Sequence, residues 1–206
     1  MDWDKVSAEL NRKLDPAAIK PAPAGKYGDY VDGYHVISEA NRIFGNGGWS
    51  YEISRMQETS RIEVETPRGK QARVSFLCTV KVRVGETYKE GSAVGMGSGK
   101  PDNIGDVIES AVKEAETDAL KRALRTYGNT FGLALYDKDR EHVGIEPDAN
   151  EIDAALANIA AAATIPVLGN IWAGLNQNAR HVAANPAVIA AKEARKTQIQ
   201  QKDDAA

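Results

Sequence analysis

Residues 72–84 alternate between apolar and polar side chains with a regularity that fits a β-strand with one buried face. The apolar positions of this segment are Val74, Phe76, Cys78, Val80, Val82 and Val84. The positions between them include Arg73, Ser75, Lys81 and Arg83. Successive side chains of a strand point to opposite faces of its sheet. One face is therefore expected to pack on a core while the other meets water, as is typical of antiparallel sheets.

Neighbouring segments supply partners for this strand. Further strands are predicted at residues 49–55, 61–66 and 87–93. In the second of these, Ile62 and Val64 are expected to point inward. Residues 67–70 and 85–86 carry turn signals. Together these segments predict an antiparallel β-meander.

A long helix is predicted next, from about residue 105 to residue 127. Its apolar positions are Ile108, Ala111, Val112, Ala115, Ala119 and Ala123. Their helical spacing places them on one stripe. That stripe is suited to lie across the meander, which predicts an α+β fold with a β-β-β-α core.

Other segments also predict helices, at residues 4–14 and 34–44. After residue 140 the composition changes to a linker, 141–150, and then to an Ala-rich segment, 151–206. Helices are expected there at residues 151–163, 165–177 and 186–201, with Thr164 and Asn185 as N-caps. The sequence thus predicts one domain over residues 1–140 and an α-helical C-terminal appendage.

Composition and charge exclude several classes of protein. The 206 residues carry a net charge of −3 and a pI near 5.7, which argues against DNA coating through uniform positive charge. Cys78 is the only cysteine, so an intramolecular disulfide and a zinc site built on cysteines are excluded. Neither a signal peptide nor the ~18 apolar residues of a membrane span can be recognised. We expect a cytoplasmic protein without a membrane partner.

Positive charge is concentrated near the end of the long helix. Lys121, Arg122 and Arg125 flank its apolar stripe, just before a Tyr-Gly-Asn break at residues 127–129. Cations beside a buried stripe point into the edge of a groove, where the field of a protein is focused. The pattern fits a site for a polyanion, here single-stranded DNA. It also fits ordinary intrahelical ion pairs, because Asp118 lies four residues before Arg122.

The glycine-rich segment GSAVGMGSGKP, residues 91–101, is expected to be a loop. It does not match a P-loop, because Pro101 stands where the magnesium-binding Ser or Thr would be. A flexible loop that offers backbone N–H groups and Lys100 to a DNA backbone is the preferred interpretation. A nucleotide-dependent enzyme acting through Gly95 to Lys100 is the alternative.

No catalytic or metal-binding set can be assembled from the remaining polar residues. His35, Glu39 and Arg42 share one face of the helix predicted at residues 34–44, where a Glu39–Arg42 pair is favoured and two ligands are too few for a metal. The aromatic residues near the basic elements, Tyr34, Trp49 and Tyr127, are more typical of a core than of base stacking. A protein without enzymatic activity or cofactor is expected.

Three segments resemble the Rad-fifty-two family of single-strand annealing proteins, which includes phage-encoded relatives. They are VDGYHVISEANRIFGNGGWSYEI, EGSAVGMGSGK and KEAETDALKRALRTYGNTFGLALYDKD. With the strands between them, the resemblance covers about residues 25–140. It implies a β-β-β-α fold in an oligomeric ring whose outer groove holds single-stranded DNA by its backbone. The bases are then free to find their complements.

The resemblance also assigns residues to this groove. Lys121, Arg122 and Arg125 match the DNA-binding cations of the family, and Lys100 falls near a lysine of its outer site. His35 stands where the family usually has an arginine, which replaces a fixed charge with a titrating one. Asn46 stands where relatives often carry an aromatic residue. The C-terminal segment does not resemble the recombinase-binding tail of eukaryotic members.

The resulting hypothesis is an ATP-independent annealing protein of recombination and double-strand break repair, acting as a homo-oligomer. Expected partners are single-stranded DNA and a host single-strand-binding protein or exonuclease, in the nucleoid of a bacterial or phage-host cell. Two alternatives stay open. One is a nucleotide-dependent DNA-processing enzyme, and the other is a structural self-assembly protein whose basic helix contacts acidic residues of a neighbouring subunit.

Overall fold

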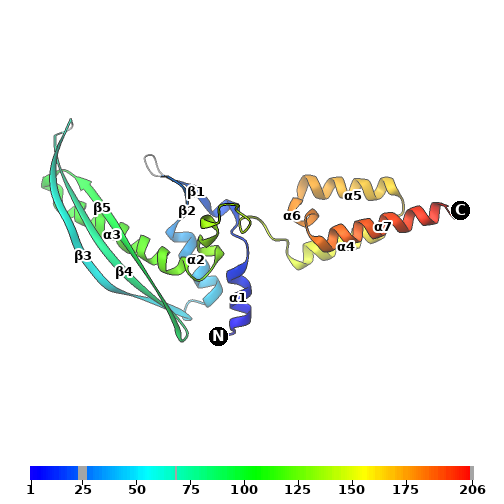
Figure 1. The fold of residues 1–206 in the computed structure, drawn as a ribbon, viewed down its shortest axis with the longest axis horizontal. Coiled ribbons are helices and arrows are strands. Elements are labelled where there is room, and N and C mark those ends of the chain that lie inside the picture. Colours follow the sequence, from blue (N-terminus) through cyan, green and yellow to red (C-terminus); the bar gives the residue numbers. More distant parts are fainter. Residues whose placement is uncertain (23–26, 68, 205–206) are drawn as a thin grey trace. The chain divides into compact units, whose positions relative to one another are not determined.

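The computed structural model describes residues 1–22, 27–67 and 69–204 (Figure 1). The chain divides into two compact units, Met1–Val143 and Gly144–Ala206. The assignment of annealing to the first unit, and of a separate role to the second, stays a prediction. Each unit is described by itself.

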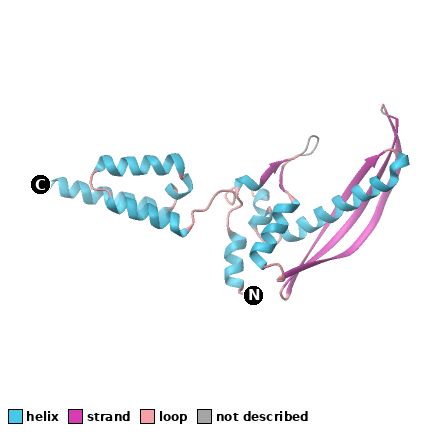
Figure 2. Ribbon diagram, turned by 180° about the vertical axis from the view of Figure 1, so that it is seen from behind, coloured by secondary structure: helices cyan, strands magenta, loops and turns pink. Residues whose placement is uncertain are grey.

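The first unit is built on a three-stranded antiparallel sheet. Its strands are β3 (Trp49–Thr66), β4 (Gly69–Val84) and β5 (Thr87–Gly99), in the order β3-β4-β5. Of the alternating apolar positions of β4, Phe76 is partly buried and the others are buried, and Val80 and Val82 have no exposed surface. Helix α3 (Ile104–Arg125) runs along the sheet (Figure 2). The predicted α+β fold, with a meander packed on a long helix, is confirmed.

The first strand differs from the prediction, because β3 is continuous where two short strands were expected. Its pairing with β4 shifts register twice, between Ile53 and Arg55 and between Glu58 and Ser60. Each shift inserts an extra residue and changes the face on which the following side chains lie. The two shifts together restore the original alternation. Ile62 pairs with Arg73 of the solvent face and is 49% exposed, so its predicted inward orientation was wrong.

The glycine-rich segment is not a loop but most of strand β5. Its glycines alternate with exposed residues and lie against the backbone of α3. A Cβ atom built on Gly95 would stand 2.2 Å from both the carbonyl oxygen of Ala111 and the amide nitrogen of Ala115. On Gly97 it would stand 1.8 Å from the carbonyl oxygen of Val107. Glycine is required here because the helix backbone occupies the space of a side chain, although glycine disfavours strands in general.

The other elements of this unit close the end of the sheet at which α3 terminates. They are α1 (Trp3–Asn11), β1 (Ile19–Pro21), β2 (Asp29–Val31) and α2 (Gly33–Phe44). The two short strands pair with each other. Short 3₁₀ helices also occur here, η1 (Pro16–Ala18), η3 (Asn129–Phe131) and η4 (Leu133–Tyr136). Phe44, Leu124 and Phe131 belong to the core that joins these segments to the sheet.

The second unit is helical, as expected from its Ala-rich sequence. It contains α4 (Ala149–Ala161), α5 (Ile165–Asn178), α6 (Arg180–Ala183) and α7 (Pro186–Asp204). The predicted cap at Thr164 is confirmed, since its side chain accepts from the amide of Val167. Asn185 likewise accepts a hydrogen bond from the amide of Ala187. In the described part of the chain, no helix is both long and apolar enough to cross a membrane.

The contact between β5 and α3 generates a test of stability. We expect Gly95→Ala to lower the free energy of unfolding by about 2 kcal/mol or more, because overpacking of a tight contact typically costs ~1–3 kcal/mol. Urea denaturation followed by circular dichroism measures the change. Gly105→Ala is the matched control, because Gly105 lies in α3 and a methyl group added to it would meet open space. Equal stability of the two variants would contradict the close packing.

Candidate nucleic-acid interface

The last turns of α3 carry the three cations that the sequence singled out. Between Lys121, Arg122 and Arg125, the residues Ala123 and Leu124 are completely buried. The buried residues fix the rotation of the helix about its axis. The cations therefore emerge beside the packed stripe and not opposite to it, as the helical spacing predicted.

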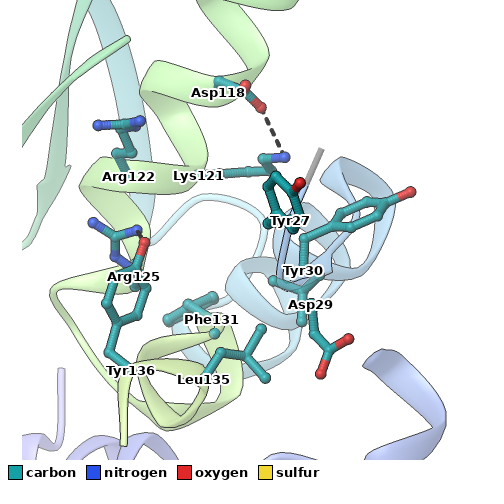
Figure 3. Close-up of a pocket in the computed structure, with 12 residues that line it drawn as sticks. Tyr27, Asp29, Tyr30, Asp118, Lys121, Arg122, Arg125, Phe131, Leu135 and Tyr136 are labelled. Carbon is teal, nitrogen blue, oxygen red and sulfur yellow. Dashed lines mark hydrogen bonds and ion pairs between the residues drawn. The ribbon is translucent and has the colours of Figure 1, made fainter. Parts of the chain in front are cut away.

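All three cations line one depression of about 320 Å³, the basic cavity (Figure 3). Its other walls come from residues 27–31 around β2 and from residues 131–136 after α3. The turn into η4 depends on Gly132, whose φ of +92° favours glycine. A Cβ there would also lie 2.9 Å from Cγ2 of Val31. The sequence around the Tyr-Gly-Asn break thus folds back to build one side of the cavity.

Lys121 is confined by two neighbouring side chains. Its Nζ lies 2.8 Å from Oδ1 of Asp118, and its side chain is 23% exposed. The same Nζ lies 5.5 Å from the ring centroid of Tyr30. Asp118 therefore pairs with the residue three positions later and not with Arg122, the partner considered from the sequence.

The two arginines differ in their freedom. Arg125 lies over the ring of Tyr136, with its guanidinium carbon 4.2 Å from the ring centroid. It also donates a hydrogen bond to the Tyr136 hydroxyl oxygen. Arg122 is exposed and forms no hydrogen bond or ion pair with any residue that the structure describes. One arginine is thus held in place, while the other is available to a ligand.

The charge of the basic cavity favours an anion. Three cations line it together with two carboxylates, those of Asp29 and Asp118. Asp29 is already paired with Arg140, whose Nη2 lies 2.9 Å from its Oδ2. A concave surface with excess positive charge focuses the field onto a bound anion. This local excess is compatible with the net negative charge of the whole chain.

His35 does not line the basic cavity. Its Nε2 lies 3.0 Å from the carbonyl oxygen of Thr130, so the ring donates a hydrogen bond to the chain after α3. It belongs to another depression of about 250 Å³, which carries charges of both signs. The remaining residues around it are Glu9, Arg12, Lys13, Asp15, Glu39, Arg42 and Thr130.

The predicted Glu39–Arg42 pair is present beside His35. Nη2 of Arg42 lies 2.8 Å from Oε2 of Glu39. Burial opposes the ionisation of Glu39, but hydrogen bonds from Arg42 and Thr130 hold its pKa below the ordinary value. The pair stabilises the junction of α2 with the segment after α3, which makes it a structural feature.

Lys100 lies at the opposite end of α3 from the basic cavity. It is exposed and precedes η2 (Pro101–Asn103), which leads into the helix. The helix rises ~1.5 Å per residue, so Ile104 and Lys121 are separated by about 25 Å along its axis. Within one chain, the structure does not bring Lys100 to the other cations.

The aromatic residues of the basic cavity differ from those considered in the sequence. Trp49 donates to Asn41, and Tyr127 packs edge-on against Phe44, so both serve the fold. The cavity is lined instead by three tyrosines, Tyr27, Tyr30 and Tyr136, and by the core residue Phe131. The sequence could have indicated these tyrosines, because each lies next to Gly or Asp in a polar segment. Aromatic residues in such segments are not expected in a core.

Comparison with known proteins identifies the first unit. A model of the Rad52/22 family of double-strand break repair proteins matches residues 2–152. The DNA repair and recombination protein RAD52 of Eremothecium gossypii is 36% identical over 144 residues, which are 66% of this chain and 31% of that protein. RAD52 of Saccharomyces cerevisiae is 35% identical over 144 residues, 66% of this chain and 28% of that protein. The DNA repair and recombination protein radC of Emericella nidulans is 39% identical over 140 residues, 65% of this chain and 23% of that protein.

The chain matches less than a third of the length of these relatives. The phage origin stays a prediction. The family model includes residues 2–143 of the first unit, and with them the sheet, α3 and the basic cavity. The family model spans well over half of the chain, and the relatives agree with it. The protein therefore belongs to the Rad52/22 family of double-strand break repair proteins.

Proposed function

We propose that the protein binds single-stranded DNA through the basic cavity and anneals complementary strands as a ring-forming oligomer. The observation that carries this proposal is the convergence of Lys121, Arg122 and Arg125 on one concave surface. Phosphate oxygens are the ligands that suit these groups, and arginine in particular binds them in bidentate fashion.

The three cations would contribute to phosphate binding in different ways. Arg125 is held against Tyr136 and loses little freedom on contact with a phosphate. Arg122 is free to adjust to the path of the strand. Lys121 shares its charge with Asp118, so a phosphate there completes the coordination of an ammonium group already in place. Contacts of this kind read the backbone and carry no sequence preference.

Annealing by such a surface requires neither ATP nor a catalytic residue. Pairing of complementary strands supplies about 1.4 kcal/mol per base-pair step, which drives the reaction. The protein contributes by holding the backbone while the base edges stay accessible. Assembly of several subunits multiplies a modest site into strong binding through avidity.

The remaining expectations are part of the same proposal. Lys100 would serve a second contact with DNA, at the other end of α3. A host single-strand-binding protein or an exonuclease would act beside the protein in the cytoplasm of a bacterial or phage-host cell. The helical second unit would provide a surface for partner contact or assembly.

The two alternative functions receive no specific support. A nucleotide site at Gly95 to Lys100 would need accessible backbone amides, but Gly95 and Gly97 face the backbone of α3. A self-assembly protein would use the basic cavity for acidic residues of a neighbour and would not pair DNA strands.

A fluorescence annealing assay with complementary oligonucleotides tests the proposal. We expect pairing without nucleotide or metal, at a rate that rises with protein concentration up to saturation of the strands. Loss of pairing in the variant Arg122→Gln, at concentrations where the wild type is active, would link the activity to the basic cavity. A purified protein that neither binds nor pairs oligonucleotides at low salt would refute the proposal.

The charge of Arg122 should be visible in the salt dependence of binding. We expect Arg122→Gln to weaken binding to oligo-dT and to reduce the slope of log K against log salt by ~0.7 per lost phosphate contact. Fluorescence anisotropy at several salt concentrations measures both quantities. The control is Lys113→Gln, since Lys113 lies on the same helix outside the basic cavity and pairs with Glu109. Equal slopes for the two variants would contradict phosphate binding by Arg122.

His35 would serve a further contact with DNA outside the basic cavity, from the depression that it lines with Arg12, Lys13 and Arg42.

A further inference from the structure

Next to the basic cavity lies a second depression of about 280 Å³, the tyrosine cavity. Tyr27 and Tyr30 line both depressions, together with Asp29 and Asp118, and so lie where the two meet. Lys121 also borders both depressions. Figure 3 shows its side chain extending from α3 toward the two rings. Positive charge and aromatic surface are thus adjacent at this point.

Neither tyrosine belongs to the hydrophobic core. Tyr27 is fully exposed, so both faces of its ring are open to a ligand. Tyr30 is half-buried and meets the Lys121 ammonium with one side of its ring. An exposed ring beside a phosphate-binding cation provides a flat apolar surface where a strand would pass.

The electrostatics of the two depressions differ. Asp29, Asp118 and Lys121 line both depressions. The basic cavity adds the cations Arg122 and Arg125, whereas the tyrosine cavity adds the carboxylate of Glu114, so its carboxylates outnumber its one cation. Glu114 accepts a hydrogen bond from the amide of Met96, which keeps its carboxylate close to the sheet edge. Carboxylates repel phosphate but tolerate an uncharged base. The tyrosine cavity therefore suits the neutral part of a nucleotide, and the basic cavity suits its phosphate.

We propose that Tyr27 and Tyr30 form a stacking platform for bases of the bound strand. This inference rests on the proposed function, because it assumes that the phosphates occupy the basic cavity. Stacking on aromatic rings is tolerant of sequence, since every base has a π-face. It occupies the face of a base and leaves the Watson–Crick edge open. A strand held in this way keeps the ability to pair.

The platform can be tested separately from the cations with an abasic oligonucleotide. Such a strand has the phosphates of oligo-dT but none of its bases, so the cations contact both strands equally. We expect the wild type to bind oligo-dT at least about fivefold more tightly than the abasic strand of equal length, from the typical strength of base–aromatic stacking. The measurement is fluorescence anisotropy at one fixed salt concentration.

Variants test whether the two tyrosines cause the preference for oligo-dT over the abasic strand. The double variant Tyr27→Leu/Tyr30→Leu should bind both strands with nearly equal affinity, while its salt slope stays that of the wild type. The double variant Tyr27→Phe/Tyr30→Phe keeps the rings and should keep the preference. The control Tyr88→Leu removes an exposed tyrosine that lies beside Lys81 and Arg83 on the sheet, away from both cavities, and should behave as the wild type.

The possible outcomes distinguish this inference from the proposed function. If the wild type binds the two strands equally, or if the leucine double variant retains the preference, the platform is refuted while phosphate binding stands. If the wild type binds neither strand, the proposed function fails and the platform fails with it. Retention of thermal stability in the leucine double variant confirms that the loss concerns the surface, as expected from the full exposure of Tyr27.

Discussion

The close contact between the glycines of β5 and the backbone of α3 determines the geometry on which the basic cavity depends. Because Gly91, Gly95 and Gly97 lack side chains, the helix lies directly on the strand, and its own alanines face the sheet. A helix seated so closely has little freedom to rotate or slide. Its C-terminal cations consequently emerge at a fixed place relative to β2 and to the chain after α3. The glycine-rich segment thus contributes to the site through packing, without touching a ligand.

A net charge of −3 is compatible with a polyanion site because the positive charge is local and partly immobilised. Asp118 reduces the excess charge of the basic cavity but confines the Lys121 ammonium to it. Tyr136 confines the Arg125 guanidinium to the cavity through its ring and its hydroxyl group. Side chains that are already ordered lose less entropy when they bind. The carboxylate therefore weakens the attraction at long range, while the carboxylate and the tyrosine both strengthen the contact at short range.

The sequence predicted those features that depend on local periodicity. The alternation of β4 and the apolar stripe of α3 indicated the architecture, and helical spacing placed Lys121, Arg122 and Arg125 on one side of the helix. Features that depend on partners distant in sequence were missed. Glycine is a poor strand former unless another backbone covers it, so the glycine-rich part of β5 was taken for a loop. The register shifts of β3 and the approach of Tyr27 and Tyr30 to α3 arise only in the folded chain.

An annealing surface must satisfy two opposing demands, since it has to hold a strand firmly and yet release it into a duplex. Cations satisfy the first demand because they bind phosphates irrespective of sequence. A surface with cations alone leaves the bases disordered, and each base then has to find the helical arrangement during pairing. Rings that touch only the face of a base, as we infer for Tyr27 and Tyr30, would reduce this disorder without covering the edge that pairs. Lys121 Nζ lies 5.5 Å from the centroid of the Tyr30 ring, so one nucleotide is long enough to place its phosphate at the cation and its base at the ring.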